Sequence, residues 1–124
     1  MLPQLSAAVR VFLCTRPTDM RKGFDGLSGL VQECFGQDLL TGHLFLFLNR
    51  RRDRIKVLYF DRDGLAIWYK RLEVGSFQNP VPTPGAVQLS GSAGIELSVT
   101  DLALILNGID LATARRRKRY CRVG

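Results

Sequence analysis

The chain has 124 residues, of which 46% are hydrophobic and 23% are charged, close to the averages of folded globular proteins. This composition excludes disordered and collagen-like classes, and the length fits one domain with its own core. No apolar run approaches the roughly 20 residues of a membrane-spanning helix, and residues 1–8 do not resemble a signal peptide. We therefore expect a cytoplasmic protein that does not contact a membrane.

The formal net charge of +7 favours a polyanionic partner. Six of the 18 basic residues lie close to the C-terminus: Arg115, Arg116, Arg117, Lys118, Arg119 and Arg122. The other 12 face 11 acidic residues, so the rest of the chain carries a net charge of only +1. We predict a single, nearly neutral domain over residues 1–112 and a basic, mobile tail over residues 113–124.

The first predicted elements are a strand over residues 9–13 and a helix over residues 20–35. In the helix, Phe24, Leu27, Val31 and Cys34 recur at the spacing of one buried face, and Gly36 is a typical helix stop. Glycines at 23, 26 and 29 weaken this helix, and two interpretations remain open.

In the first interpretation of these glycines, the helix begins late, near Asp25, and Gly26 or Gly29 permits close packing on a strand. In the second, the first turn of the helix contacts a phosphate or a partner protein, because the free N–H groups at a helix start favour anions. The candidate partner-binding residues of that turn are Thr18, Asp19, Arg21 and Lys22.

The centre of the chain predicts an antiparallel meander of three strands, over residues 43–49, 55–60 and 65–72. Residues 50–54 and 61–64 provide the two turns, of which the second is rich in aspartate and glycine. In the third strand the polarity changes towards the end, so Lys70 and Arg71 mark where it leaves the core.

Prolines and glycines between residues 75 and 94 predict an irregular connection, with at most a short strand over residues 86–89. A second helix follows over residues 98–108, with Ser98 and Asp101 as a weak capping box and Gly108 as its end. The predicted fold class is α+β: a small antiparallel β-meander sheet packed with two helices, over residues 20–35 and 98–108.

Residues that could support catalysis are scarce, so we expect a non-enzymatic protein without metal or cofactor. Asp61 and Asp63 lie in a tight turn, where aspartate commonly bonds the backbone. His43 is the only histidine and is most simply structural. Cys14, Cys34 and Cys121 form no Cys-x-x-Cys pair, which fits reduced thiols better than a zinc site or a disulfide framework.

Two clusters of basic residues are candidate nucleic-acid contacts, because guanidinium groups bind phosphate in bidentate geometry and a two-stranded ribbon fits the major groove. The candidates are Arg50, Arg51, Arg52, Arg54 and Lys56 at the first turn, Lys70 and Arg71 at the end of the third strand, and Arg115, Arg116, Arg117, Lys118 and Arg119 in the tail. A solvated turn with a solubilising tail is the alternative. Aromatic residues at strand spacing are more often part of the core, and among those nearby Tyr59 and Tyr69 are the exceptions best suited to stack on bases.

Several motifs resemble one known family. The stretches 18–27, 42–59 and 63–73, together with 106–110, are similar to the TnpB-type accessory proteins of the insertion-sequence-66 family of bacterial transposable elements. The resemblance covers about residues 8–111. In that family a short strand usually leads directly into the final helix, and residues 87–97 look looser than this pattern.

The resemblance implies a non-catalytic protein that is encoded beside a separate transposase and is needed for transposition. It supplies no catalytic residues. Two functions follow as hypotheses: binding of nucleic acid, most simply DNA, in support of the transposition complex, or a pure protein-interaction module that docks on the transposase. The sequence does not determine the oligomeric state.

Overall fold

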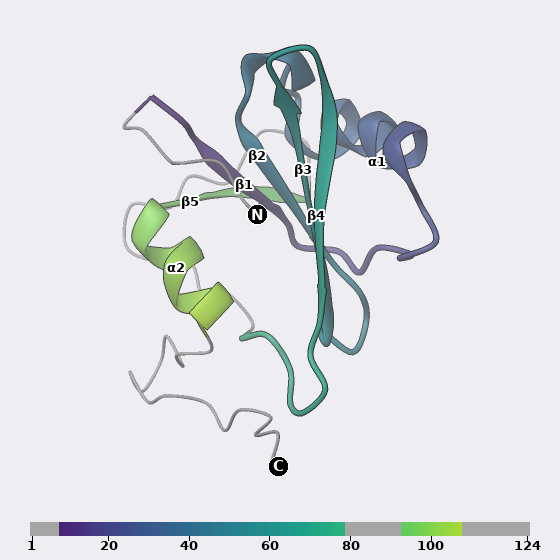
Figure 1. The fold of residues 1–124 in the computed structure, drawn as a ribbon, viewed down its shortest axis with the longest axis vertical. Helices are drawn as coiled ribbons and strands as arrows, with labels where there is room; N and C mark the ends of the chain where they lie inside the picture. Colours follow the sequence, from purple (N-terminus) through teal and green to yellow (C-terminus); the bar gives the residue numbers. More distant parts are fainter. Residues whose placement is uncertain (1–7, 79–92, 108–124) are drawn as a thin grey trace.

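The computed structural model describes residues 8–78 and 93–107, which form one open sheet with a helix on each face (Figure 1). The strands are β1 (Val11–Cys14), β2 (Leu44–Leu48), β3 (Arg54–Asp61), β4 (Gly64–Arg71) and β5 (Gly94–Leu97). Their order in the sheet is β4-β3-β2-β1-β5. The α+β class is therefore confirmed.

The predicted meander is present as β2, β3 and β4, which pair antiparallel. The sheet as a whole is mixed, however, because β1 pairs parallel with β2 and antiparallel with β5. Parallel neighbours need a crossover connection, and the helical segment between residues 24 and 41 provides it. The sheet is therefore mostly antiparallel, as predicted, with one parallel pair that the predicted meander does not include.

The predicted first helix is shorter than the pattern suggested. Helix α1 (Phe24–Leu30) continues into a π-helical turn (Val31–Phe35) and ends at Gly36, which adopts the left-handed conformation. Residues 18–23 are not helical, so the late start is correct. Leu27, Val31 and Cys34 are buried as predicted, but Phe24 at the start of the helix is 48% exposed.

The predicted close packing of Gly26 or Gly29 on a strand is wrong. A Cβ at Gly29 would meet no atom within 4 Å, and one at Gly26 would meet only the side chain of Lys22. The tight approach is instead at Gly94 in β5, where a Cβ would lie 2.6 Å from the carbonyl oxygen of Cys34. Because residue 94 has no side chain, β5 can lie directly against the end of the helical segment while it pairs with β1.

The last two elements follow the family pattern, in which a short strand leads directly into the final helix, although residues 87–97 looked looser in the sequence. Strand β5 leads directly into helix α2 (Val99–Asn107), so residues 94–97 are not irregular. The capping box is confirmed, since the Asp101 amide donates to Ser98 Oγ at 3.0 Å and the Ser98 amide to the Asp101 carboxylate at 3.4 Å. The predictions for residues 86–89, Gly108 and the tail lie outside the described residues.

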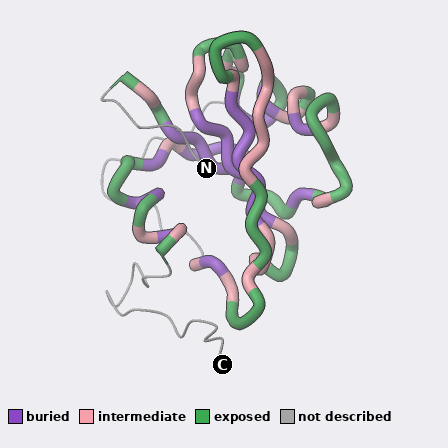
Figure 2. Tube along the Cα trace, in the orientation of Figure 1, coloured by how far each residue is buried: buried purple, intermediate pink, exposed green. Residues whose placement is uncertain are grey.

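The core has two layers, one on each face of the sheet, and Figure 2 shows buried residues concentrated in the central strands. On one face, α1 and the π-helical turn cover Phe12, Phe45 and Phe47. On the other, α2 packs with Leu102 and Ile105 against residues such as Leu46 and Val57. Every residue of β2, between these layers, is buried.

The described cysteines and the histidine make contacts within the fold. Cys14 and Cys34 are free, buried thiols with their Sγ atoms 3.6 Å apart, and burial raises the pKa of Cys14 to about 11. His43 Nδ1 accepts a hydrogen bond from the Arg10 amide, and its ring lies edge-on to Phe12. No helix within residues 8–78 and 93–107 is long and apolar enough to span a membrane.

Candidate nucleic-acid interface

The parallel pairing of β1 and β2 brings two predicted site regions together. The carboxyl ends of parallel neighbours lie at the same end of a sheet. The loop after β1 and the turn after β2 therefore meet, and the Thr18 amide donates to the Leu48 carbonyl at 2.7 Å, just beyond the paired residues. The candidate partner residues of the loop thus lie beside the arginines of the β2–β3 turn.

Between this loop and the turn lies an open groove of about 480 Å³, which we call the basic groove. Its lining residues are Thr18, Asp19, Met20, Arg21, Asn49, Arg50, Arg51, Asp53 and Arg54. A second hollow of about 280 Å³ shares Asn49 and Arg50 with it and adds Arg16 and Arg52. The β2–β3 turn therefore projects between two hollows that are both lined by arginine.

Several hydrogen bonds fix the β2–β3 turn. The Asn49 side chain donates to the Asp53 carboxylate at 2.6 Å and accepts from the Arg54 amide at 3.1 Å. The Leu72 amide bonds the Asp53 carbonyl, and the amide of buried Phe77 bonds the Arg52 carbonyl. The backbone of the turn is thus held at its base, while Arg50 and Arg51 are exposed.

The arginines of the turn differ in their partners. Arg54 donates to the Tyr69 hydroxyl at 3.2 Å. For Arg50, Arg51 and Arg52, no ion pair or side-chain hydrogen bond is formed with any residue in the described part of the chain. These three guanidinium groups keep their donors available for an external anion.

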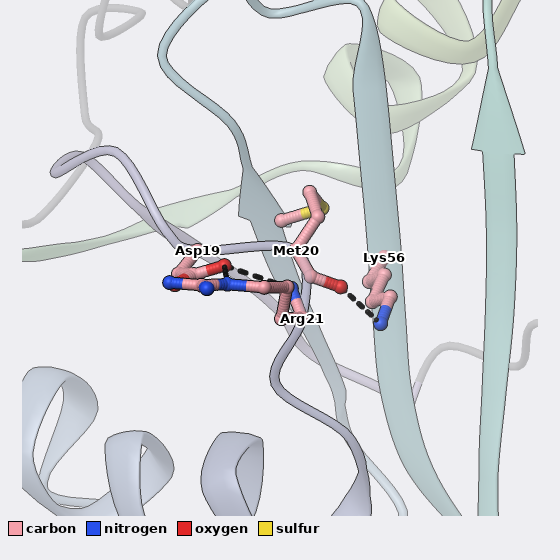
Figure 3. Close-up of polar contacts among 4 residues, drawn as sticks. All are labelled: Asp19, Met20, Arg21 and Lys56. Atoms are coloured by element: carbon pink, nitrogen blue, oxygen red, sulfur yellow. Dashed lines mark hydrogen bonds and ion pairs between the residues drawn. The ribbon is translucent and has the colours of Figure 1, made fainter.

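Lys56 has a different place from the one the sequence suggested. It is 8% exposed, and its ammonium group donates to the carbonyl oxygen of Met20 at 2.8 Å (Figure 3). It also donates to the carbonyl oxygen of Lys22 at 2.8 Å. The Tyr69 ring lies 4.8 Å from Nζ, in cation–π geometry. Lys56 therefore holds the loop that contains residues 20 and 22 against the sheet, as a clamp. Its ammonium group is used inside the protein and is not available as the predicted nucleic-acid contact.

The loop held by this clamp is exposed but ordered by local contacts. Asp19 accepts hydrogen bonds from Nε and Nη2 of the Arg21 side chain and from the Arg21 amide, and Figure 3 shows this pair beside Lys56. These bonds hold the pKa of Asp19 at about 2. Thr18 is buried, whereas the side chain of Arg21 is 92% exposed. Lys22 is also exposed.

The remaining candidates are divided between the described and undescribed parts of the chain. Lys70 and Arg71 are exposed at the end of β4, as predicted, and Arg71 pairs with Glu73 at 3.0 Å. Arg71 lies opposite Arg54 in the β3–β4 register, at the same end of the sheet as the basic groove. Tyr69 is 47% exposed, but Tyr59 is buried. Residues 115–119 lie outside the described residues.

The opposite end of the sheet carries the β3–β4 turn with Asp61, Arg62 and Asp63. Within residues 8–78 and 93–107, no three histidine, cysteine, aspartate or glutamate side chains cluster in a way that could hold a metal ion. The fold and the groove together define a small α+β domain that concentrates arginine at the carboxyl ends of two parallel strands.

Residues 9–116 match the IS66 Orf2-like protein family, and the chain belongs to that family. Two uncharacterized proteins of Sinorhizobium fredii are similar to it. One, y4hO, is 36% identical over 124 residues and the whole length of both chains. The other, y4jC, is 30% identical over 112 residues, which are 90% of this chain and 89% of the relative. No solved structure matches the chain. The family associates the chain with transposition.

Proposed function

We propose that this protein is a non-catalytic, cytoplasmic accessory protein of transposition that binds DNA phosphates through the basic groove and acts beside the transposase of the same element. Family membership supports the biological setting. The observation that carries the molecular proposal is the β2–β3 turn, where the backbone is fixed and Arg50, Arg51 and Arg52 make no ion pair or side-chain hydrogen bond within the described residues.

The chemistry of the turn suits phosphate better than a neutral ligand. Guanidinium groups bind phosphate oxygens with two parallel hydrogen bonds and are more weakly hydrated than ammonium groups. Because the backbone of the turn is already ordered, binding does not have the additional cost of ordering a loop. These contacts read the DNA backbone, so they position the protein without selecting a base sequence.

The test is a binding titration of the full chain with a duplex from the end of the element and with a scrambled duplex, between about 50 and 200 mM salt. We expect affinity for both duplexes to fall steeply with salt. The variant Arg50→Ala/Arg51→Ala/Arg52→Ala should lower the slope of log affinity against log salt by about 3, or about 0.9 for each lost phosphate contact. Lack of binding at the lowest salt would sink the proposal.

A deletion of residues 115–124 separates the groove from the tail. If the groove is the main contact, the deletion weakens binding but leaves the effect of the triple variant intact. If the triple variant has no effect once the tail is gone, the tail alone accounts for binding and the groove has no part in it.

Docking on the transposase is a second candidate function, favoured by the loop at residues 19–23. Its side chains are largely exposed while Lys56 holds its backbone, which suits a surface that recognises another protein. Co-purification with the transposase should survive deletion of residues 115–124 and be lost in Arg21→Ala/Lys22→Ala. Failure of the two proteins to associate at any salt concentration would exclude this function.

A further inference from the structure

Strand β4 forms one edge of the sheet. It pairs with β3 along eight residues, and no strand in the described part of the chain pairs with its other side. The core layers formed with α1 and α2 lie on the two faces of the sheet (Figure 1). An open edge of this length offers a row of backbone groups to another strand.

The hydrogen-bond alternation identifies which residues of β4 face outward. The Asn49 amide donates to the Arg54 carbonyl, so the backbone groups of Arg54 point towards β2. Because this direction alternates along a strand, the even-numbered residues of β3 bond to β2 and the odd-numbered residues bond to β4. Their partners in β4 are residues 64, 66, 68 and 70. The Leu72 amide, which bonds Asp53 on the same side, follows the same alternation. The backbone groups of residues 65, 67, 69 and 71 therefore point away from the sheet.

Both faces of β4 also present apolar surface that the sheet covers only partly. Leu65 and Ile67 pack against the core layer of α1, and Ala66 and Trp68 against the layer of α2. All four side chains are half-buried, whereas every residue of β2 is fully buried. A further strand beside β4 would cover this surface on both faces at once.

We propose that β4 pairs antiparallel with β4 of a second copy of this chain, around a two-fold axis at Ile67. In this register each outward-facing residue meets another outward-facing residue, as a hydrogen-bonded pair requires. Ile67 lies opposite itself and Leu65 opposite Tyr69, and the carboxylate of Asp63, in the turn just before β4, comes opposite the Arg71 side chain of the second copy. The last pair, which occurs twice, joins opposite charges.

Other registers fit less well. A shift of the axis to a point between two residues would place outward-facing groups opposite inward-facing ones and remove the hydrogen bonds. A two-fold axis at Tyr69 shortens the overlap and places Arg71 opposite Ile67. The register at Ile67 gives the longest overlap and pairs the two charges, so the edge is complementary to itself. This pairing does not depend on DNA binding.

Cross-linking tests the register. In a Cys121→Ser background, Ile67→Cys places two thiols on the axis, at a Cα separation of about 5.5 Å, which a disulfide can bridge. Leu65→Cys is the matched control, because its two copies would lie about 13 Å apart along the strands. Under mild oxidation we expect covalent dimers with Ile67→Cys only. Equal cross-linking of both variants, or none with either, would overturn the proposal.

Sedimentation of the full-length chain over a range of concentrations tests the dimer itself. We expect a dimer whose dissociation constant rises about tenfold in Asp63→Arg and in Arg71→Asp, and returns towards the original value in the double exchange. A monomer at all concentrations overturns the proposal and would be the outcome if another segment of this chain, or a strand of a different protein, occupies the edge. A dimer insensitive to all three variants overturns it as well.

Discussion

The two turns at opposite ends of β3 share a backbone feature and differ in charge. Each contains an arginine in the left-handed conformation, Arg52 at φ 57° and Arg62 at φ 55°. The β2–β3 turn adds Arg50 and Arg51, which have no ionic partner in the described part of the chain, and meets the loop after β1, whereas the β3–β4 turn places Arg62 between Asp61 and Asp63. The charged residues in and around each turn, and not the left-handed backbone conformation that both turns share, therefore distinguish the candidate phosphate site.

Charge reversal at the two turns should give the largest contrast. We expect Arg50→Glu/Arg51→Glu to lower DNA affinity on the order of 100-fold, because two phosphate contacts are replaced by repulsion. Arg62→Glu at the other turn should change affinity by less than about twofold. Fluorescence anisotropy at one fixed salt concentration measures both. Comparable losses at the two turns would mean that DNA responds to net charge and not to the basic groove.

Removal of the clamp should be the next largest effect. Lys56→Met keeps the length of the side chain but leaves the carbonyls of Met20 and Lys22 without their donor, so we expect a loss of about 1–3 kcal/mol of unfolding free energy. Lys70→Met, an exposed neighbour on β4, should change stability by less than about 0.5 kcal/mol. Urea unfolding compares the two, and equal losses would contradict the clamp.

Substitution of glycine for the two arginines in the left-handed conformation separates the effect of backbone conformation from the effect of charge. Arg52→Gly and Arg62→Gly should each change stability by no more than about 1 kcal/mol, since relief of the left-handed conformation is offset by a more flexible unfolded chain. Only Arg52→Gly should reduce the salt dependence of DNA binding, by about 0.9. An equal reduction from Arg62→Gly would place the DNA contact outside the β2–β3 turn.

The smallest effect concerns the exposed pair in the loop. The pKa of Asp19 is about 2 in the folded chain, below the value of about 4 of a free aspartate, so its ion pair stabilises the fold above about pH 4. This contribution is lost as the pH falls from about 4 towards 2. Comparison of urea midpoints should show a slightly shallower acid dependence for Asp19→Asn. An unchanged acid dependence would mean that the pair does not persist in solution.

Much of the fold could be predicted because its signals are local. Alternating aromatic and branched residues with turn residues between them predicted β2, β3 and β4, and Gly36 and Ser98 marked a helix end and a helix start. β5 was missed because four residues that begin with glycine carry little strand signal. The parallel partner of β1 was missed because strand pairing is a property of the whole chain.

The candidate site was predicted in pieces. The residues of the loop and the arginines of the turn were both identified, but as separate regions, since only the parallel pairing of β1 and β2 brings them together. Lys56 was assigned to the basic turn because it follows a run of arginines. Its position between Ile55 and Val57, in the middle of a buried strand, was the signal that its ammonium must find partners inside the protein.

The clamp of Lys56 also has a consequence for how relatives diverge. Its partners are the main-chain carbonyls of residues 20 and 22, so this anchor does not depend on which side chains those two residues carry. A substitution at the exposed position 22 can therefore change the chemistry of the surface while the anchor to the sheet is kept.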